Sequence, residues 1–449
     1  PWAMRVRQIG CEIQLPSATS PSMPARPPHY SAPAGTLPVL TQIWRDLFTS
    51  RVHLDSAISK LPSSSKPVVS RLLPIVLRRP VSLASALYVP IGDGEPWSVP
   101  LEKRVSWKGA RGLFVNLLPQ IEKFERKSGS ASDFPPEFFN EWERDWGREA
   151  AEELAATLSS DPPMSLRAGR NRGAEKLLEA LREEVDFSHG GPALSDVSPV
   201  GVRVAGYAAI AESSPFREGW CEIQDEGSQF MSLFALWPDL YAKYLNEKPG
   251  AWKHAATTQP PRGRSAGLTV IDACAGAGGK SLAMADLLEG RGRAFAYDVS
   301  PVKLSALKRR ALRWGFNNIQ TVVVHSGEEA SLEAKFGAKA DRVLIDAPCS
   351  GWGVLRRSPD IKWKWDCAVG ESDLPALQLR LLNGYARLAK PGGFVTFGVC
   401  TFRREETVEV VQKFLDSTTD FELVAKGFVG PGPCDGFFMA AFRRKGAPA

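Results

Sequence analysis

The stretch "LTVIDACAGAGGKSLAMADLL" (residues 268–288) decides the fold class, because a strand-like run, a glycine-rich loop and a helix-like run follow one another in it. The same alternation continues to the end of the chain. Strand-like runs occur at 293–300, 319–324, 341–347, 394–399 and 436–444, and helical patterns lie around 304–314, 374–389 and 405–416. This order predicts an α/β domain with a Rossmann-like, doubly wound parallel sheet, which we place at residues 220–449.

The first 135 residues predict two parts of different character. Residues 1–40 are rich in proline, serine and alanine and contain a single acid, so we expect a disordered or targeting segment. Residues 41–135 predict a largely helical domain, because apolar residues recur there at helical spacing. We expect short helices punctuated by Pro62, Pro67, Pro74 and Pro80.

Residues 136–219 predict a small α+β subdomain. Helical patterns lie around 138–158 and 174–184. A connection rich in Gly, Pro and Ser follows them and contains a short strand-like run at 202–205.

Composition excludes several classes of protein. The 449 residues carry 56 Lys and Arg against 50 Asp and Glu, a net charge of +6, and 43% are hydrophobic. No apolar run approaches the ~18 residues of a membrane span, so we expect no membrane association. Five histidines, and seven cysteines without a CxxC pair, argue against a metal cluster and a disulfide scaffold and predict a reducing compartment.

The loop between the first strand and its helix predicts a site for a nucleotide-like cofactor. Gly276, Gly278 and Gly279 allow a tight turn, and we expect the closest approach to a ligand at Gly278. Asp298 ends the next strand, where a carboxylate can bind ribose hydroxyls. The spacing fits neither a Walker loop nor GxGxxG, which favours a cofactor with ribose but no pyrophosphate, such as S-adenosylmethionine. The alternative is a merely structural turn.

Two thiols and a carboxylate follow neighbouring strands. "DAPCSGWG" places Asp346 and Cys349 after one strand, and "FGVCTF" places Cys400 after the next. We expect them to converge on the crevice that holds the glycine loop. A thiolate that adds to carbon 6 of cytosine lets carbon 5 accept a methyl group, while an acid at ring nitrogen 3 stabilises the developing charge. The alternative, cysteine as a small buried apolar residue, is preferred for Cys274 and Cys367.

At these residues the chain resembles a known family. "DACAGAGGK", "DAPCSGWGVLRRSPDIKWKW" and "FGVCTFRREE" resemble strings of the Sun/RsmB-type (NSUN-like) RNA cytosine-5 methyltransferases. "QDEGSQ" (224–229) and "DGFFMAAF" (435–442) look like the family's flanking motifs, and residues 50–90 more loosely resemble its NusB-like N-terminal domain.

The resemblance implies roles for individual residues. Cys400 would be the nucleophile, Cys349 would assist release of the product, and Asp346 would contact the target base. The S-adenosylmethionine site would comprise Cys274, Ala275, Gly276, Ala277, Gly278, Gly279, Lys280, Asp298, Ser326 and Asp346.

Three positions depart from the family's pattern. Ala277 stands where a proline commonly precedes the paired glycines, and "VCT" (399–401) replaces Thr-Cys-Ser. "HSG" (325–327) stands where the adenine-side aspartate is expected.

Basic residues border the proposed site. Arg356, Arg357 and Lys362 are interleaved with three tryptophans, which suits single-stranded RNA through phosphate pairing and base stacking. Those tryptophans are Trp352, Trp363 and Trp365. The alternative is a solvated charged surface over core tryptophans. The helix after Asp298 adds Lys303, Lys308, Arg309, Arg310 and Arg313, and "RNRG" (170–173) predicts RNA contacts in the α+β subdomain.

We therefore predict an S-adenosylmethionine-dependent RNA (cytosine-5)-methyltransferase that is monomeric and contains no metal. The preference for rRNA as the substrate rests on the N-terminal resemblance, and tRNA is the close alternative. A rival is a catalytically idle RNA-binding ribosome assembly factor. A nicotinamide dehydrogenase ranks third, because GxGxxG is absent. We expect a cytoplasmic protein, or an organellar one if residues 1–40 are a transit peptide.

Overall fold

The computed structural model describes residues 36–49, 53–87, 107–117, 129–187, 190–204, 209–250, 253–263, 267–364 and 373–446. All of them belong to one compact unit, Ala32–Ala449. Most of the predicted disordered or targeting segment lies outside the described residues, as do Trp365 and Cys367. In the described part of the chain, no helix is both long and apolar enough to cross a membrane.

The N-terminal region is helical, as predicted. Its described helices are α1 (Thr36–Thr49), α2 (Leu54–Ser59), α3 (Lys66–Arg78), α4 (Pro80–Leu87) and α6 (Trp107–Leu117). They share an apolar core that includes Leu47, Leu72 and Phe114. The expectation that Pro74 interrupts a helix is wrong, because α3 continues through it with buried neighbours on both sides. Their packing offsets the backbone hydrogen bond that proline lacks. The NusB-like identity of this region stays a prediction.

The helix expected around 138–158 is two helices. Gly147, with φ of +86°, separates α8 (Pro136–Trp146) from α9 (Arg148–Leu158). Both helices pack into the core of the large sheet, where Phe138 stacks on Trp352 with ring centroids 4.1 Å apart. This part of the predicted α+β subdomain therefore packs with the large sheet.

A small antiparallel sheet follows. Its strands are β1 (Met164–Ala168), β2 (Ala193–Leu194), β3 (Gly201–Val204) and β4 (Cys221–Ile223), in the order β2-β3-β1-β4. Helix α10 (Ala174–Glu184), found where predicted, covers the sheet with Leu177 and Leu181. A four-residue helix, α11 (Ser214–Arg217), leads into β4. Because β4 belongs to this sheet, the sheet extends beyond residue 219.

The large sheet has the predicted Rossmann-like character. Its strands are β5 (Thr269–Asp272), β6 (Arg293–Asp298), β7 (Ile319–Val323), β8 (Ala340–Asp346), β9 (Ala389–Val399), β10 (Phe421–Val429) and β11 (Phe437–Arg444). The order is β10-β11-β9-β8-β5-β6-β7, in which β5 to β9 pair parallel and β10 and β11 pair antiparallel.

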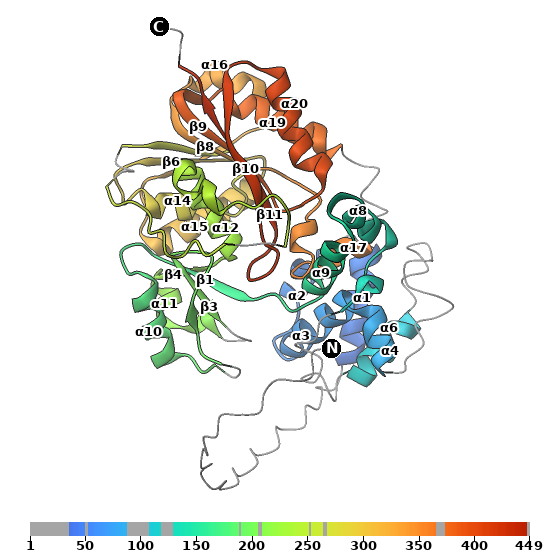
Figure 1. The fold of residues 1–449 in the computed structure, drawn as a ribbon. Coiled ribbons are helices and arrows are strands. Elements are labelled where there is room, and N and C mark those ends of the chain that lie inside the picture. Colours follow the sequence, from blue (N-terminus) through green and yellow to red (C-terminus); the bar gives the residue numbers. More distant parts are fainter. Residues whose placement is uncertain are drawn as a thin grey trace, which may run out of the picture. The chain divides into compact units, whose positions relative to one another are not determined.

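Helices cover both faces of this sheet (Figure 1). One set comprises α12 (Glu226–Leu236), α13 (Pro238–Tyr241), α14 (Gly279–Leu287) and α15 (Pro301–Trp314). The other comprises α16 (Leu332–Phe336), α19 (Leu374–Ala386) and α20 (Val408–Ser417), while the short α17 (Asp360–Trp363) follows the β8 loop.

Two strands differ from the sequence prediction. Strand β9 begins at Ala389 instead of 394, and its pairing with β8 shifts register across the Pro391–Gly393 turn residues. The sequence analysis did not predict strand β10. This strand lies at the edge of the sheet, and its exposed side chains interrupt the apolar run by which a strand is recognised.

Candidate active site

The carboxyl ends of β5, β6, β8 and β9 meet at one edge of the sheet. Parallel pairing sets Asp272 opposite Leu344 and Asp346 opposite Gly398, so the loops after these strands are neighbours. The loops carry the predicted site residues, and the predicted convergence is therefore found. The chemical roles of the residues stay predictions.

Asp298 organises the glycine loop. Its carboxylate accepts the Gly276 N–H and the Ser300 N–H, each at 2.8 Å. Gly276 has φ of +55°, and a β-carbon built there would meet no atom within 4 Å. The backbone at Gly276 therefore borders open space in which a ligand can lie.

Position 278 requires glycine, but not for the reason we expected. It caps α14 with φ of +89°, and a β-carbon there would lie 2.3 Å from Cγ of the buried Leu307. The expectation that a side chain at Gly278 would meet the ligand is wrong, because the neighbour is a core leucine of α15. A valine at this position would test packing instead of cofactor binding.

Lys280 and Asp346 form a close ion pair at the centre of the strand ends. Lys280 Nζ donates to Asp346 Oδ2 at 2.5 Å, and the lysine side chain is largely buried. Burial alone would lower the pKa of Lys280, but the Asp346 carboxylate outweighs it and raises the pKa above 10.5. Lys280 is therefore a cation held beside the acid proposed to contact the base.

The two thiols lie side by side. Cys349 Sγ and Cys400 Sγ are 3.3 Å apart, and both residues are partly exposed. The contact with Cys400 and then burial raise the pKa of Cys349 well above its usual value. Backbone hydrogen bonds join the loops, from Ala347 N–H to Gly398 O and from Gly353 N–H to Cys400 O, each at 2.9 Å. The backbones of the two loops thus hold the thiols side by side.

The other predicted cofactor residues lie in the loops after β5 and β7. Burial raises the pKa of Cys274, which packs against the main core, so its thiol behaves as a small apolar group. Ala277 O accepts a hydrogen bond from Arg310 at 2.6 Å, and Ser326 Oγ accepts one from Arg380 at 3.3 Å. Across the described residues, no group of three or more His, Cys, Asp or Glu could hold a metal ion.

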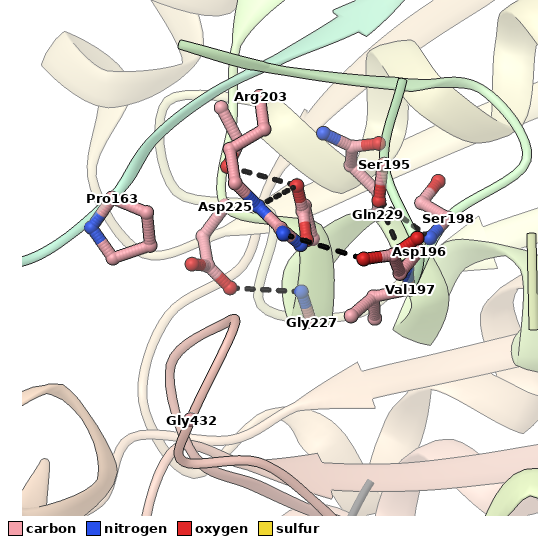
Figure 2. A network of polar contacts seen from close by, with 12 residues as sticks. Pro163, Ser195, Asp196, Val197, Ser198, Arg203, Asp225, Gly227, Gln229 and Gly432 are labelled. Atoms are coloured by element: carbon pink, nitrogen blue, oxygen red, sulfur yellow. Dashed lines mark hydrogen bonds and ion pairs between the residues drawn. The ribbon is translucent and has the colours of Figure 1, made fainter. Parts of the chain in front are cut away.

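Arg356 is buried, although we expected it to contact RNA at the surface. It is 2% exposed, and its Nε donates to Asp435 Oδ1 at 2.9 Å. Arg357, whose side chain is 36% exposed, pairs with Asp435 at 2.7 Å and with Asp225 at 3.2 Å. Asp225 also accepts the Gly227 N–H at the start of α12 (Figure 2). The prediction of an RNA contact at Arg356 is wrong, because its charge is neutralised inside the protein.

Lys362 is likewise buried, at 1% exposure. Its ammonium donates to Arg78 O at 2.6 Å and to Asp133 O at 2.7 Å. The neighbouring Trp363 donates its indole N–H to Leu77 O at 2.9 Å and packs in the core of the N-terminal helices. The prediction that Lys362 binds RNA is therefore wrong, and the segment attaches the β8 loop to α3.

Lys362 gives the protein a pH-dependent stability that can be measured. Burial lowers the pKa of Lys362 to about 7, from 10.5 for the unfolded side chain, with Asp133 opposing this effect and Arg78 and Arg79 adding to it. Between these values the unfolded chain binds more protons, so the lysine's contribution to stability rises with pH. The Tm of wild type minus that of Lys362→Met should therefore increase from about pH 6 to about pH 9. Lys308→Met, on the exposed side of α15, is the control, and a constant difference would contradict the assignment.

Some of the other residues that were predicted to contact RNA lie at the surface, and others are buried or paired. Trp352 and Trp363 are buried, so neither can stack on a base. In α15, Lys303, Lys308 and Arg309 are exposed, whereas Arg310 and Arg313 pair with Glu222. In "RNRG", Arg172 is exposed and lies 4.4 Å from the Trp220 ring, whereas Arg170 pairs with Glu289 at 2.6 Å.

The sequence analysis missed a residue that supports the thiols. Glu406, in the "FRREE" string, is fully buried and accepts the Ser350 N–H at 2.9 Å. The only sign of this residue in the sequence was a carboxylate that follows the strand-end Cys400 along the chain. Its long-range partner could not be inferred from spacing.

The chain is similar to proteins of one family. A sequence model described as "16S rRNA methyltransferase RsmB/F" matches residues 263–442. "Probable ribosomal RNA small subunit methyltransferase B" of Bacillus subtilis is 30% identical over 447 residues, covering 91% of this chain and 90% of that protein. "Ribosomal RNA small subunit methyltransferase B" of Klebsiella pneumoniae (strain 342) is 30% identical over 313 residues, covering 67% of this chain and 62% of that protein.

Solved structures share the fold. "Crystal Structure of PH0851" superimposes with a TM-score of 0.64 at 20% identity, covering 92% of this chain and 99% of that chain. "The crystal structure of NSun6 from Pyrococcus horikoshii with SFG" has a TM-score of 0.55 at 17% identity, covering 69% of this chain and 98% of that chain.

Proposed function

This chain belongs to the RsmB/F family of S-adenosylmethionine-dependent RNA methyltransferases, and on that premise we propose that it methylates carbon 5 of a cytosine in small-subunit ribosomal RNA. The observation that carries the proposal is the pair of thiols 3.3 Å apart, beside the Lys280–Asp346 ion pair at the strand ends. The names of the relatives favour small-subunit rRNA over tRNA.

The residues at the strand ends fit S-adenosylmethionine. Gly276 borders open space, the first turn of α14 offers backbone N–H groups to a carboxylate, and Asp298 can accept from ribose hydroxyls while holding the loop. We propose Cys274–Lys280, Asp298, Ser326 and Asp346 as the site. When bound, the cofactor supplies an electrophilic methyl group on a sulfonium.

We propose that Cys400 acts as the nucleophile. Its thiolate forms a bond to carbon 6 of cytosine, which makes carbon 5 nucleophilic. Asp346, oriented by Lys280, contacts the edge of the base at nitrogen 3. After methyl transfer the proton on carbon 5 passes to the Cys349 thiolate, the double bond between carbons 5 and 6 re-forms, the bond from carbon 6 to sulfur breaks, and Cys400 departs as a thiolate. Cys349, whose sulfur lies 3.3 Å from that of Cys400, thus assists this release.

We propose that the RNA lies over the exposed cations Lys303, Lys308, Arg309 and Arg172 and over the half-buried Arg357. We also propose that the protein is a monomer. It would act where its ribosomal subunit is assembled, in the cytoplasm or in an organelle.

Bisulfite sequencing of small-subunit rRNA tests the function directly. RNA from cells that lack the protein should lose one protected cytosine, and wild-type protein but not Cys400→Ala should restore it. Protection that persists without the protein would overturn the proposal. Restoration by Cys400→Ala would favour an RNA-binding assembly factor.

Asp298→Ala should weaken S-adenosylmethionine binding by about 1–3 kcal/mol, because charge-assisted hydrogen bonds are lost. Calorimetry measures the change. Asp298→Asn should lose less affinity, since an amide oxygen can still accept the Gly276 N–H. Glu422→Gln, at an exposed position of β10, is the matched control. An affinity for Asp298→Ala equal to that of wild type would refute the ribose contact.

A further inference from the structure

Glu406 is a buried carboxylate between the two thiol loops. It ends a short 3₁₀ turn, Arg404–Glu406, on the chain that follows Cys400. Its Oε2 accepts the Ser350 N–H at 2.9 Å and an Nε2–H of Gln378 at 3.0 Å. Ser350 directly follows Cys349, so a side chain from one thiol loop holds the backbone of the other.

Further contacts hold the Cys349 loop against the Cys400 loop and α19. Ser350 Oγ lies 2.9 Å from Oγ1 of Thr401, the residue after Cys400. Gln378, on α19, also donates to Pro348 O at 2.9 Å, on the other side of Cys349. Cys349 is therefore held from both neighbours, and Glu406 and Gln378 together supply the hydrogen bonds.

The negative charge of Glu406 also affects the Cys349 thiol. After the contact with Cys400 and burial, this carboxylate is a further cause that raises the pKa of Cys349. The nearest cation is Arg403, whose Nη1 lies 3.6 Å from Oε1 of Glu406 and which also pairs with Glu141 and Glu405. A fully buried carboxylate is costly unless its hydrogen bonds are made, which ties its position to the Ser350 amide.

We propose that Glu406 is a positioning residue that holds Cys349 against Cys400 for the release step. The inference rests on the proposed function. Glu406 touches neither substrate nor cofactor and acts through the loop that carries Cys349. Without its carboxylate the loop loses its anchor, so addition by Cys400 continues while release slows.

The test compares Glu406→Leu with Glu406→Gln. The leucine cannot accept the Ser350 N–H, so kcat should fall ~10–100-fold with little change in KM for RNA, since a displacement near 1 Å can cost that much. A covalent protein–RNA adduct that survives denaturing electrophoresis should accumulate, as in Cys349→Ala. The glutamine keeps an acceptor oxygen and should restore release. Glu405→Gln, the adjacent residue at 46% side-chain exposure, is the matched control and should match wild type.

A double variant gives the sharpest readout. If Glu406 acts through Cys349, adding Glu406→Leu to Cys349→Ala should change turnover and adduct little further. If Glu406→Leu does not fold, Gln378→Met removes the two hydrogen bonds of Gln378 and should trap adduct to a smaller extent.

The outcomes separate the inference from the proposed function. Adduct in Cys349→Ala, but neither adduct nor reduced turnover in folded Glu406→Leu, would overturn the inference alone. Additive losses in the double variant would also overturn it. A wild-type protein that methylates no RNA would overturn the proposed function instead.

Discussion

In the Cys349→Ala variant, RNA is expected to become trapped on the protein, whereas in Cys400→Ala turnover should stop without trapping. Addition to the base needs one thiolate, while release also needs proton removal and expulsion of that thiolate. The two sulfur atoms lie 3.3 Å apart, close enough to act on the same base. Denaturing electrophoresis should show a retarded band for Cys349→Ala that nuclease removes. The double variant should show none.

The reverse pattern has a definite meaning. A trapped complex in Cys400→Ala would assign the nucleophile to Cys349. Full activity in both single variants would leave the covalent mechanism without support.

Asp346→Asn should reduce turnover about 10²- to 10³-fold, since a charged group placed at the reacting base is lost. The same change leaves the largely buried Lys280 without the carboxylate that raises its pKa. Its pKa should then fall, and the pH dependence of residual activity should shift to lower pH. Single-turnover assays with labelled methyl donor across a pH series measure both effects.

The opposite end of β8 offers a matched control. Asp341 pairs with Lys390 at 2.5 Å, the same separation as in the Lys280–Asp346 pair. Asp341→Asn should leave turnover unchanged, because this pair lies away from the strand ends that carry the thiols. Equal losses in the two variants would mean that Asp346 acts on stability and not on the base.

Local patterns in the sequence were sufficient to predict which strand ends converge at the candidate site. The apolar strands fixed where Asp298, Asp346, Cys349 and Cys400 emerge, and parallel pairing requires the ends of those strands to meet. The glycine loop, the following helix and Asp298 belong to one strand–helix–strand unit. For such a unit, the order along the chain is enough to predict the arrangement in space.

Long-range contacts account for the errors. An arginine on the surface and an arginine in a buried ion pair look the same in a sequence, and the partners of Arg356 and Lys362 are remote in the chain. Gly278 faces Leu307 from another helix, and Glu406 meets Ser350 from another loop. Whether a charge binds RNA or holds the protein together depends on which distant groups remove it from water, because a buried ion is stable only with its partners in place. Those partners are specified only when all the elements have packed.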